Sequence, residues 1–196
     1  MRILAFTDPH AQKDHLDSVK KKAKQADLVI CCGDFTIFDN GLDEVLDLLE
    51  KLGKKVLLVH GNHEDEHQVA GKCKKLKNVT FLHKAVQTVQ GISFIGYGGG
   101  GFAHTDAFFE TWSSLLANEL KKKKTVLVVH QPPHDTKIDY LEWAGHVGSK
   151  SFRKFIDEVQ PKLVLCGHLH ETFNMQDKVK NSIILNPGPD GTLIEV

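Results

Sequence analysis

Residues 163–170 read LVLCGHLH, an apolar run followed by a glycine and then by two histidines one position apart. The apolar residues are typical of a buried strand, and Gly167 permits a sharp turn directly after it. Both His168 and His170 can point into one cleft if the chain turns there. Alone the pattern is a weak signal, because His-x-His also occurs by chance on exposed strands.

Four other apolar runs in the chain end in side chains of the same chemical kind. The residues at these ends are Asp8 with His10, Asp34, Asn62 with His63 and Glu64, and His130. A lone Asp or His at a strand end is usually a cap or turn residue. Because ligands of open α/β sheets bind beyond the carboxyl ends of the strands, the repeated pattern predicts one shared site.

The order of the apolar runs predicts the fold class. Residues 3–6, 28–32 and 56–59 are expected to be buried strands. Helical spacing of apolar residues predicts helices over 13–25 and 42–52. Alternating strands and helices imply right-handed crossovers and a parallel core, and therefore an α/β fold.

The rest of the chain extends this pattern. Further helices are expected at 66–76, at 106–120 and from an N-cap at Ser149 to residue 159, and a long loop is expected at 131–147. Short strands are expected at 79–82, 85–90, 92–95, 126–129, 163–165, 183–185 and 193–196. The glycine run 98–101 is expected to form a loop, and Gly53 is expected to cap the helix before it.

Composition sets bounds on function. The 196 residues predict a single domain over 1–196 with a sizeable core. The formal net charge of +0 argues against extended binding of nucleic acid. No run reaches the ~20 apolar residues of a membrane span and no targeting segment is recognisable, so a soluble, cytoplasmic protein is expected. The four cysteines show no CxxC spacing and are expected to be reduced thiols.

The candidate ligands favour transition-metal ions. Imidazole, carboxylate and amide oxygen together suit Mn, Fe, Zn, Co or Ni, whereas a structural zinc or a calcium site would use other ligands. Two ions roughly 3.5–4 Å apart are a standard device for phosphoester hydrolysis, in which a bridging water loses its proton near neutral pH and attacks. Such ions would also bind phosphate in place of arginine, since only Arg2 and Arg153 are arginines.

The ordered motifs resemble those of the calcineurin-like metallophosphoesterase superfamily. They are Asp8-x-His10, Gly33-Asp34, Gly61-Asn62-His63-Glu64, His130 and Gly167-His168-x-His170, and they follow the family's order. The resemblance implies a four-layer α/β/β/α sandwich with a dinuclear metal site at the carboxyl ends of the strands. It also implies two divalent transition-metal ions, of which we favour Mn. The segments at 130–133, 146–149 and 186–188 further resemble a small microbial branch of predicted phosphoesterases.

The resemblance implies a role for each motif residue. Asp8, His10 and His170 would hold one ion, Asp34 would bridge both ions, and Asn62, His130 and His168 would hold the other. His63 would stabilise the transition state or protonate the leaving oxygen, a role that suits a histidine because its pKa lies near neutrality. Glu64 would orient His63.

Several residues keep two interpretations. His60 is either a buried strand residue or faces the site, and His134 and His146 either touch substrate or lie in the long loop without a role. The glycine run 98–101 is either a flexible turn or a loop whose amides approach phosphate. The histidines expected at the surface are His15, His67, His83 and His104. The apolar residues expected to form a substrate wall or a dimer contact are Phe102, Phe108, Phe109, Tyr140 and Trp143.

The expected function is that of a two-metal phosphodiesterase that hydrolyses a small or nucleotide-like phosphodiester by attack of a metal-bridging hydroxide. A protein Ser/Thr phosphatase is disfavoured, because His60 stands where such an enzyme carries an arginine. A nuclease or a phosphomonoesterase of the same fold is an alternative. A non-catalytic metal-binding scaffold is the alternative of a different class, although such relatives tend to lose ligands that this chain keeps. A homo-oligomer is a possibility left open.

Overall fold

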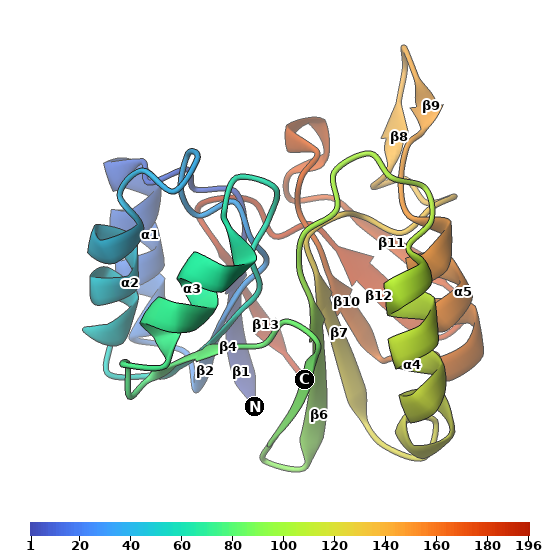
Figure 1. The fold of residues 1–196 in the computed structure, drawn as a ribbon, viewed down its shortest axis with the longest axis horizontal. Coiled ribbons are helices and arrows are strands. Elements are labelled where there is room, and N and C mark those ends of the chain that lie inside the picture. Colours follow the sequence, from blue (N-terminus) through green and yellow to red (C-terminus); the bar gives the residue numbers. More distant parts are fainter.

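The computed structural model covers residues 1–196 and consists of two β-sheets packed face to face, with helices on both outer faces (Figure 1). The layers follow one another as helices, sheet, sheet and helices. This arrangement confirms the expected α/β fold and the four-layer sandwich that the motif resemblance implied.

The first sheet has five strands in the order β13-β1-β2-β3-β4. They are β1 (Arg2–Phe6), β2 (Leu28–Cys31), β3 (Lys55–Leu58), β4 (Val79–Phe81) and β13 (Thr192–Glu195). Strands β1 to β4 are parallel, and β13 pairs antiparallel with β1 so that Ile194 lies opposite Ile3. Its outer face is covered by α1 (Lys13–Ala23), α2 (Leu42–Glu50) and α3 (Glu66–Cys73).

The second sheet has six strands in the order β11-β12-β10-β7-β6-β5. They are β5 (Ala85–Val89), β6 (Ile92–Tyr97), β7 (Thr125–Val129), β10 (Leu163–Leu165), β11 (Gln176–Val179) and β12 (Ser182–Leu185). The inner four strands are parallel, whereas β5 and β11 run antiparallel at the two edges. Helices α4 (Ala107–Leu120) and α5 (Lys150–Val159) cover its outer face.

Alternating side chains of the buried strands divide the interior into three cores. In β1, Ile3 and Ala5 join the core between the two sheets, whereas Leu4 and Phe6 join the core under the first three helices. A third core fills the space beneath α4 and α5. Because both faces of these strands are covered, their sequences are continuous apolar runs, which is why the runs could be recognised without a structure.

The predicted helix starts agree with the capping hydrogen bonds. Ser149 accepts from the amide of Phe152 at the start of α5, as expected from the sequence. Asp106 accepts in the same way from the amide of Phe109 at the start of α4. Such caps satisfy backbone donors that a helix leaves without partners. Helix α2 instead ends at a C-cap on Lys51, so Gly53 is not the cap that the sequence suggested.

Three strands and the short 3-10 helix η1 (His170–Thr172) were not predicted. The segment 131–147 contains a small hairpin of β8 (Tyr140–Leu141) and β9 (Gly145–His146), which projects above the second sheet in Figure 1. Strand β11 was missed because it is polar and lies at a sheet edge, so its sequence has no apolar period. All four cysteines are buried free thiols, as expected.

The carboxyl ends of the parallel strands of both sheets lie at one end of the sandwich, uppermost in Figure 1. The loops after β1, β2 and β3 enter this end from the first sheet, and those after β7 and β10 enter from the second. None of the helices combines the length and apolar character needed to cross a bilayer.

Candidate metal centre

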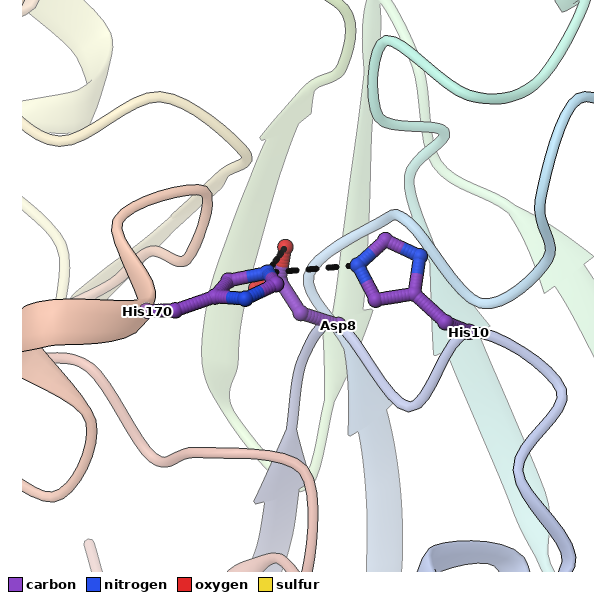
Figure 2. Close-up of side chains that lie close together, drawn as sticks. All are labelled: Asp8, His10 and His170. Carbon is purple, nitrogen blue, oxygen red and sulfur yellow. Dashed lines mark hydrogen bonds and ion pairs between the residues drawn. The ribbon is translucent and has the colours of Figure 1, made fainter.

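Asp8, His10 and His170 bring their ligand atoms together between the two sheets, as Figure 2 shows. Asp8 and His10 follow β1, whereas His170 begins the short 3-10 helix η1 (His170–Thr172) after β10. The Nε2 atoms of His10 and His170 are 3.2 Å apart, and His170 Nε2 lies 3.8 Å from Asp8 Oδ1. The group therefore joins segments that are about 160 residues apart in the chain.

Asp34, His130 and His168 form a second group of potential metal ligands. His130 Nε2 lies 3.3 Å from Asp34 Oδ2 and 3.1 Å from Asn62 Oδ1. A third group links Asp34 to His10 and His63. Asp34 therefore lies between the two histidine groups, which is the position that the predicted bridging role requires.

Glycines allow the backbone to approach both carboxylates closely. A Cβ on Gly61 would lie 2.0 Å from Asp34 Oδ1, and one on Gly167 would lie 2.4 Å from Asp8 Oδ2. Any side chain at either position would displace a candidate ligand. Positive φ angles occur at Asp8 (54°), His10 (46°), Asp34 (48°) and His168 (72°). This concentration of strained backbone is typical of a functional site.

Backbone carbonyls fix the orientation of two histidines. His10 Nδ1 lies 3.0 Å from the carbonyl oxygen of Thr36, and His130 Nδ1 lies 2.9 Å from that of Cys32. An imidazole that donates from Nδ1 presents a lone pair at Nε2, the usual arrangement in a metal-binding histidine. The buried Nε2 of His168 has no hydrogen-bond partner at all. These inward-facing nitrogen atoms fit the coordination of a cation.

The carboxylates dominate the electrostatics of the centre. Burial raises the pKa of Asp34, but the hydrogen bond and charge of His130 and the amide of His63 outweigh burial and lower that pKa to about 2. Burial lowers the pKa of His130, whereas its hydrogen bond to Asp34 and the charges of Asp8 and Asp34 raise it to about 9. In the absence of metal, a proton on His130 therefore compensates part of the negative charge.

His63 reaches the same centre from the loop after β3. Its Nε2 lies 3.9 Å from Asp34 Oδ2, and its amide donates to Asp34 Oδ1 over 2.9 Å. Its ring centroid lies 5.0 Å from that of His10. The side chain is therefore beside the candidate ligands, where it can donate a proton to a group bound between them.

Glu64 does not orient His63 as the sequence suggested, because no hydrogen bond joins the two side chains. Its buried carboxylate accepts from the amides of Asp34 (3.0 Å), Thr36 (2.8 Å) and Gly61 (2.8 Å), and from the Thr36 hydroxyl (2.8 Å). Burial raises the pKa of Glu64 despite these donors. Its role is to fasten the loop after β2 to the loop after β3, and so to hold the Asp34 and Asn62 backbones together.

His60 is a buried residue outside the centre, which resolves one of the open interpretations. Its ring packs 4.6 Å from that of His83 and 5.6 Å from that of Phe81. His83 was expected at the surface, but only 4% of its side chain is exposed, because the loop after β6 folds over it. Burial lowers the pKa of each of these histidines to about 4.

The glycine run uses part of its backbone to hold these histidines. The amide of Gly98 donates to His83 Nδ1 over 2.8 Å, and the amide of Gly99 donates to the carbonyl of His60 over 2.9 Å. Those two amides are therefore not free for a phosphate. His134 and His146 lie in the segment around the hairpin, with ring centroids 5.6 Å apart, and are not members of the ligand groups.

Two supporting residues had no clear signal in the sequence. Phe38 packs its ring 4.5 Å from that of His63 although 72% of the residue is exposed, and its φ angle is 49°. Asn186 is fully buried and donates to the carbonyl of Leu169 and the hydroxyl of Thr172, which fixes the turn that carries His168 and His170. The sequence indicated turn and backbone support at Asn186 without the partners of its side chain, and an exposed strained phenylalanine cannot be recognised from sequence.

Comparison with known proteins agrees with the fold. The family model of calcineurin-like phosphoesterases matches residues 1–172. An uncharacterized protein of Methanocaldococcus jannaschii is 33% identical over 200 residues, which cover 96% of this chain and 88% of that protein. The chain belongs to the calcineurin-like phosphoesterase family. The family defines a metal-dependent phosphoester hydrolase, and the two clusters of aspartate and histidine described above fit divalent metal ions.

Solved structures show the same fold at low sequence identity. A protein of Thermus thermophilus superimposes with a TM-score of 0.78 at 18% identity, covering 95% of this chain and 88% of that one. A dimetal phosphatase from Danio rerio superimposes with a TM-score of 0.68 at 9% identity, covering 94% of this chain and 86% of that one. At these identities the likeness concerns the fold alone.

Proposed function

We propose that this protein is a two-metal phosphodiesterase that acts on a small or nucleotide-like phosphodiester. The observation that carries the proposal is the position of Asp34, which belongs to ligand groups on both sides of the centre. Two divalent ions in such a centre neutralise phosphate charge and activate a water molecule for attack. The roles of the individual residues follow from where each side chain lies.

Asp8, His10 and His170 would hold one ion, and Asn62, His130 and His168 would hold the other, with Asp34 shared. The backbone carbonyls behind His10 and His130 keep the Nε2 lone pairs of these residues directed inward. His63 would donate a proton to the leaving oxygen, since its Nε2 lies beside the ligands, 3.9 Å from Asp34 Oδ2. We favour Mn for the two ions, with Fe, Zn, Ni and Co as alternatives.

The distribution of arginine favours a diester over a monoester. A phosphomonoester carries an additional negative charge near neutral pH, which enzymes commonly bind with arginine. Arg2 pairs with Glu195 and Arg153 pairs with Asp135 and Asp157. Neither guanidinium is therefore offered to a substrate at the metal centre.

The test is hydrolysis of bis(p-nitrophenyl) phosphate and p-nitrophenyl phosphate by chelator-stripped protein, with Mn, Fe, Co, Ni, Zn or Mg added singly. The proposal expects diester turnover that a transition metal restores and that exceeds monoester turnover. Metal content is measured on the same samples. Two bound ions per chain without turnover of either ester would favour the non-catalytic scaffold, whereas faster monoester turnover would make the protein a phosphomonoesterase.

A further inference from the structure

A pocket of about 830 Å³ lies between the β8–β9 hairpin and the turn that follows His170. Tyr140 and Trp143 line it from the hairpin, and Glu171 and Met175 line it from the opposite side. Glu171 directly follows His170, a candidate ligand of the metal centre. The pocket therefore has one wall that begins directly after a candidate ligand, and its other wall is the β8–β9 hairpin, which projects from the end of the sandwich that carries the ligand loops (Figure 1).

The walls of the pocket expose large apolar side chains. Trp143 is 79% exposed, Tyr140 is 50% exposed and Met175 is 39% exposed. Apolar groups of this size that gather around one hollow mark a surface that binds a ligand. Trp143 lies at the tip of the hairpin and belongs to none of the three hydrophobic cores.

A buried carboxylate makes the hairpin wall rigid. Asp139 is fully buried and accepts from the amides of Asp135, Thr136 and Gly148. It also lies 2.8 Å from His146 Nδ1, which holds the His146 ring against the pocket. The pocket is thus formed before any ligand arrives, so binding does not have to order the hairpin.

The charged residues of the pocket are mostly acidic. Its lining contains Asp135, Glu142, Glu171 and Asp177, against Lys137 as the single lysine or arginine. Asp135 pairs with Arg153, and Asp177 accepts from the amides of Lys137 and Lys178. The side chains of Glu142 and Glu171 take part in no ion pair or hydrogen bond, and both residues line the pocket together with Tyr140 and Trp143.

We propose that this pocket binds an alkylammonium group of the substrate. A cation is attracted to the faces of Trp143 and Tyr140 and to the carboxylates of Glu142 and Glu171, whereas a second phosphate would be repelled. The inference rests on the proposed function, because it places the phosphate at the metal centre. It narrows the substrate to a phosphodiester of an amino alcohol or a similar cationic alcohol.

Binding is tested without catalysis through Trp143. The variant W112F leaves Trp143 as the only tryptophan, so its fluorescence reports on the pocket. Titration with choline is compared with titration by 3,3-dimethylbutan-1-ol, which has the same shape but no charge. The proposal expects saturable quenching with choline and at least tenfold weaker binding of the neutral alcohol. Equal binding of the two, or no binding of choline, overturns the inference.

A matched pair of variants separates the effect of a carboxylate in the pocket from the effect of the overall charge of the protein. Glu142→Gln removes one free carboxylate of the pocket, whereas Glu44→Gln removes an exposed carboxylate of α2 on the other half of the molecule. Choline binding should weaken severalfold in the first variant and stay unchanged in the second. An equal response of the two variants contradicts the assignment to this pocket.

Turnover distinguishes failure of this inference from failure of the proposed function. The ratio of kcat/KM for p-nitrophenyl phosphorylcholine to that for its 3,3-dimethylbutyl analogue should exceed ten and should fall in Glu142→Gln. A ratio near one in an active enzyme overturns the inference and leaves the phosphodiesterase proposal intact. Choline binding without turnover of any diester supports the pocket assignment and overturns the phosphodiesterase proposal.

Discussion

The two sheets contribute different chemistry to the metal centre. Loops of the first sheet provide Asp8, His10, Asp34, Asn62 and His63, which include both carboxylates. Loops of the second sheet provide only imidazoles, from His130, His168 and His170. The negative charge that would attract divalent ions therefore comes from one half of the molecule, and the other half would complete the coordination with imidazoles. Neither half can form the centre alone.

The charge contributed by the first sheet should matter most, and the strongest test removes the shared carboxylate. Asp34→Asn keeps the shape of the side chain and should lower kcat/KM by about 10³-fold, because charge stabilisation at a reaction centre has this scale. Metal content should fall together with activity. Asp47→Asn, on the exposed face of α2, is the control. Full activity of Asp34→Asn would show that the negative charge from the first sheet is not what the reaction depends on.

His63 separates catalysis from metal binding within the first half. His63→Ala should retain both ions and lose about 10²-fold in kcat, the scale of a general acid. The loss should be larger for an alkyl diester than for a p-nitrophenyl diester, because nitrophenolate leaves without a proton. An identical loss with both substrates would contradict the role of proton donor and leave His63 as a residue that stabilises charge.

A variant of Glu64 tests whether metal binding needs the hydrogen bonds that hold the loop after β2 against the loop after β3. Glu64→Gln keeps the side-chain volume but replaces one acceptor oxygen by a donor, which conflicts with the amides of Asp34 and Gly61. We expect metal affinity to fall by about 10- to 100-fold, as for other residues behind metal ligands. Titration of metal into stripped protein measures this. Unchanged affinity would show that the ligands hold their positions without Glu64.

The contribution of the second half can be tested in the metal-free protein through the pH dependence of stability, which reflects the proton on His130. Its pKa is raised from 6.5 to about 9, so its contribution to stability is complete below pH 6.5 and is lost as the pH rises through about 9. The midpoint of thermal unfolding of stripped protein should fall over this range. His130→Gln should flatten the slope without abolishing it, because the pKa of His170 is also raised, through the nearby carboxylate of Asp8. Saturating metal should remove this pH dependence of the unfolding midpoint, since a bound metal ion displaces the proton from His130.

Phe38 is expected to give the smallest effect. Its φ of 49° is unfavourable for a bulky residue, and its exposed ring buries little surface. Phe38→Asn should therefore raise the free energy of unfolding by about 1 kcal/mol and lower kcat severalfold through the lost contact with His63. Gln90→Asn, at a φ of 48° in the β5–β6 turn, should stabilise similarly without loss of activity. Loss of activity in both variants would rule out a specific role for Phe38.

The parts of the fold that the sequence predicted are those with strong local signals. Continuous apolar runs such as 126–129 specify strands that are buried on both faces, and Ser149 marks a helix start through its own side chain. The hairpin of β8 and β9 and the edge strand β11 have no such signal. Their position depends on contacts with distant residues, such as Asp139 at the base of the hairpin.

The candidate site was predictable in its residues and less so in its contacts. The seven predicted ligands do lie together, because each follows a strand whose carboxyl end faces the same side of the molecule. The partners of Glu64 could not be foreseen, since three backbone amides from two loops meet only in the folded chain. His83 was misplaced at the surface because a glycine loop far along the chain covers it.

The pairing of β13 with β1 joins two strands that are far apart in the sequence. As the chain emerges from a ribosome, Asp8 and Asp34 appear long before His168 and His170. During that interval the open edge of β1 can pair with another chain, which is a hazard for aggregation. The two ligand groups that contain His168 or His170 draw on both sheets, so they can form only after the second sheet has joined the first. A shortage of metal would then leave newly synthesised chains folded but free of metal, and therefore without hydrolase activity.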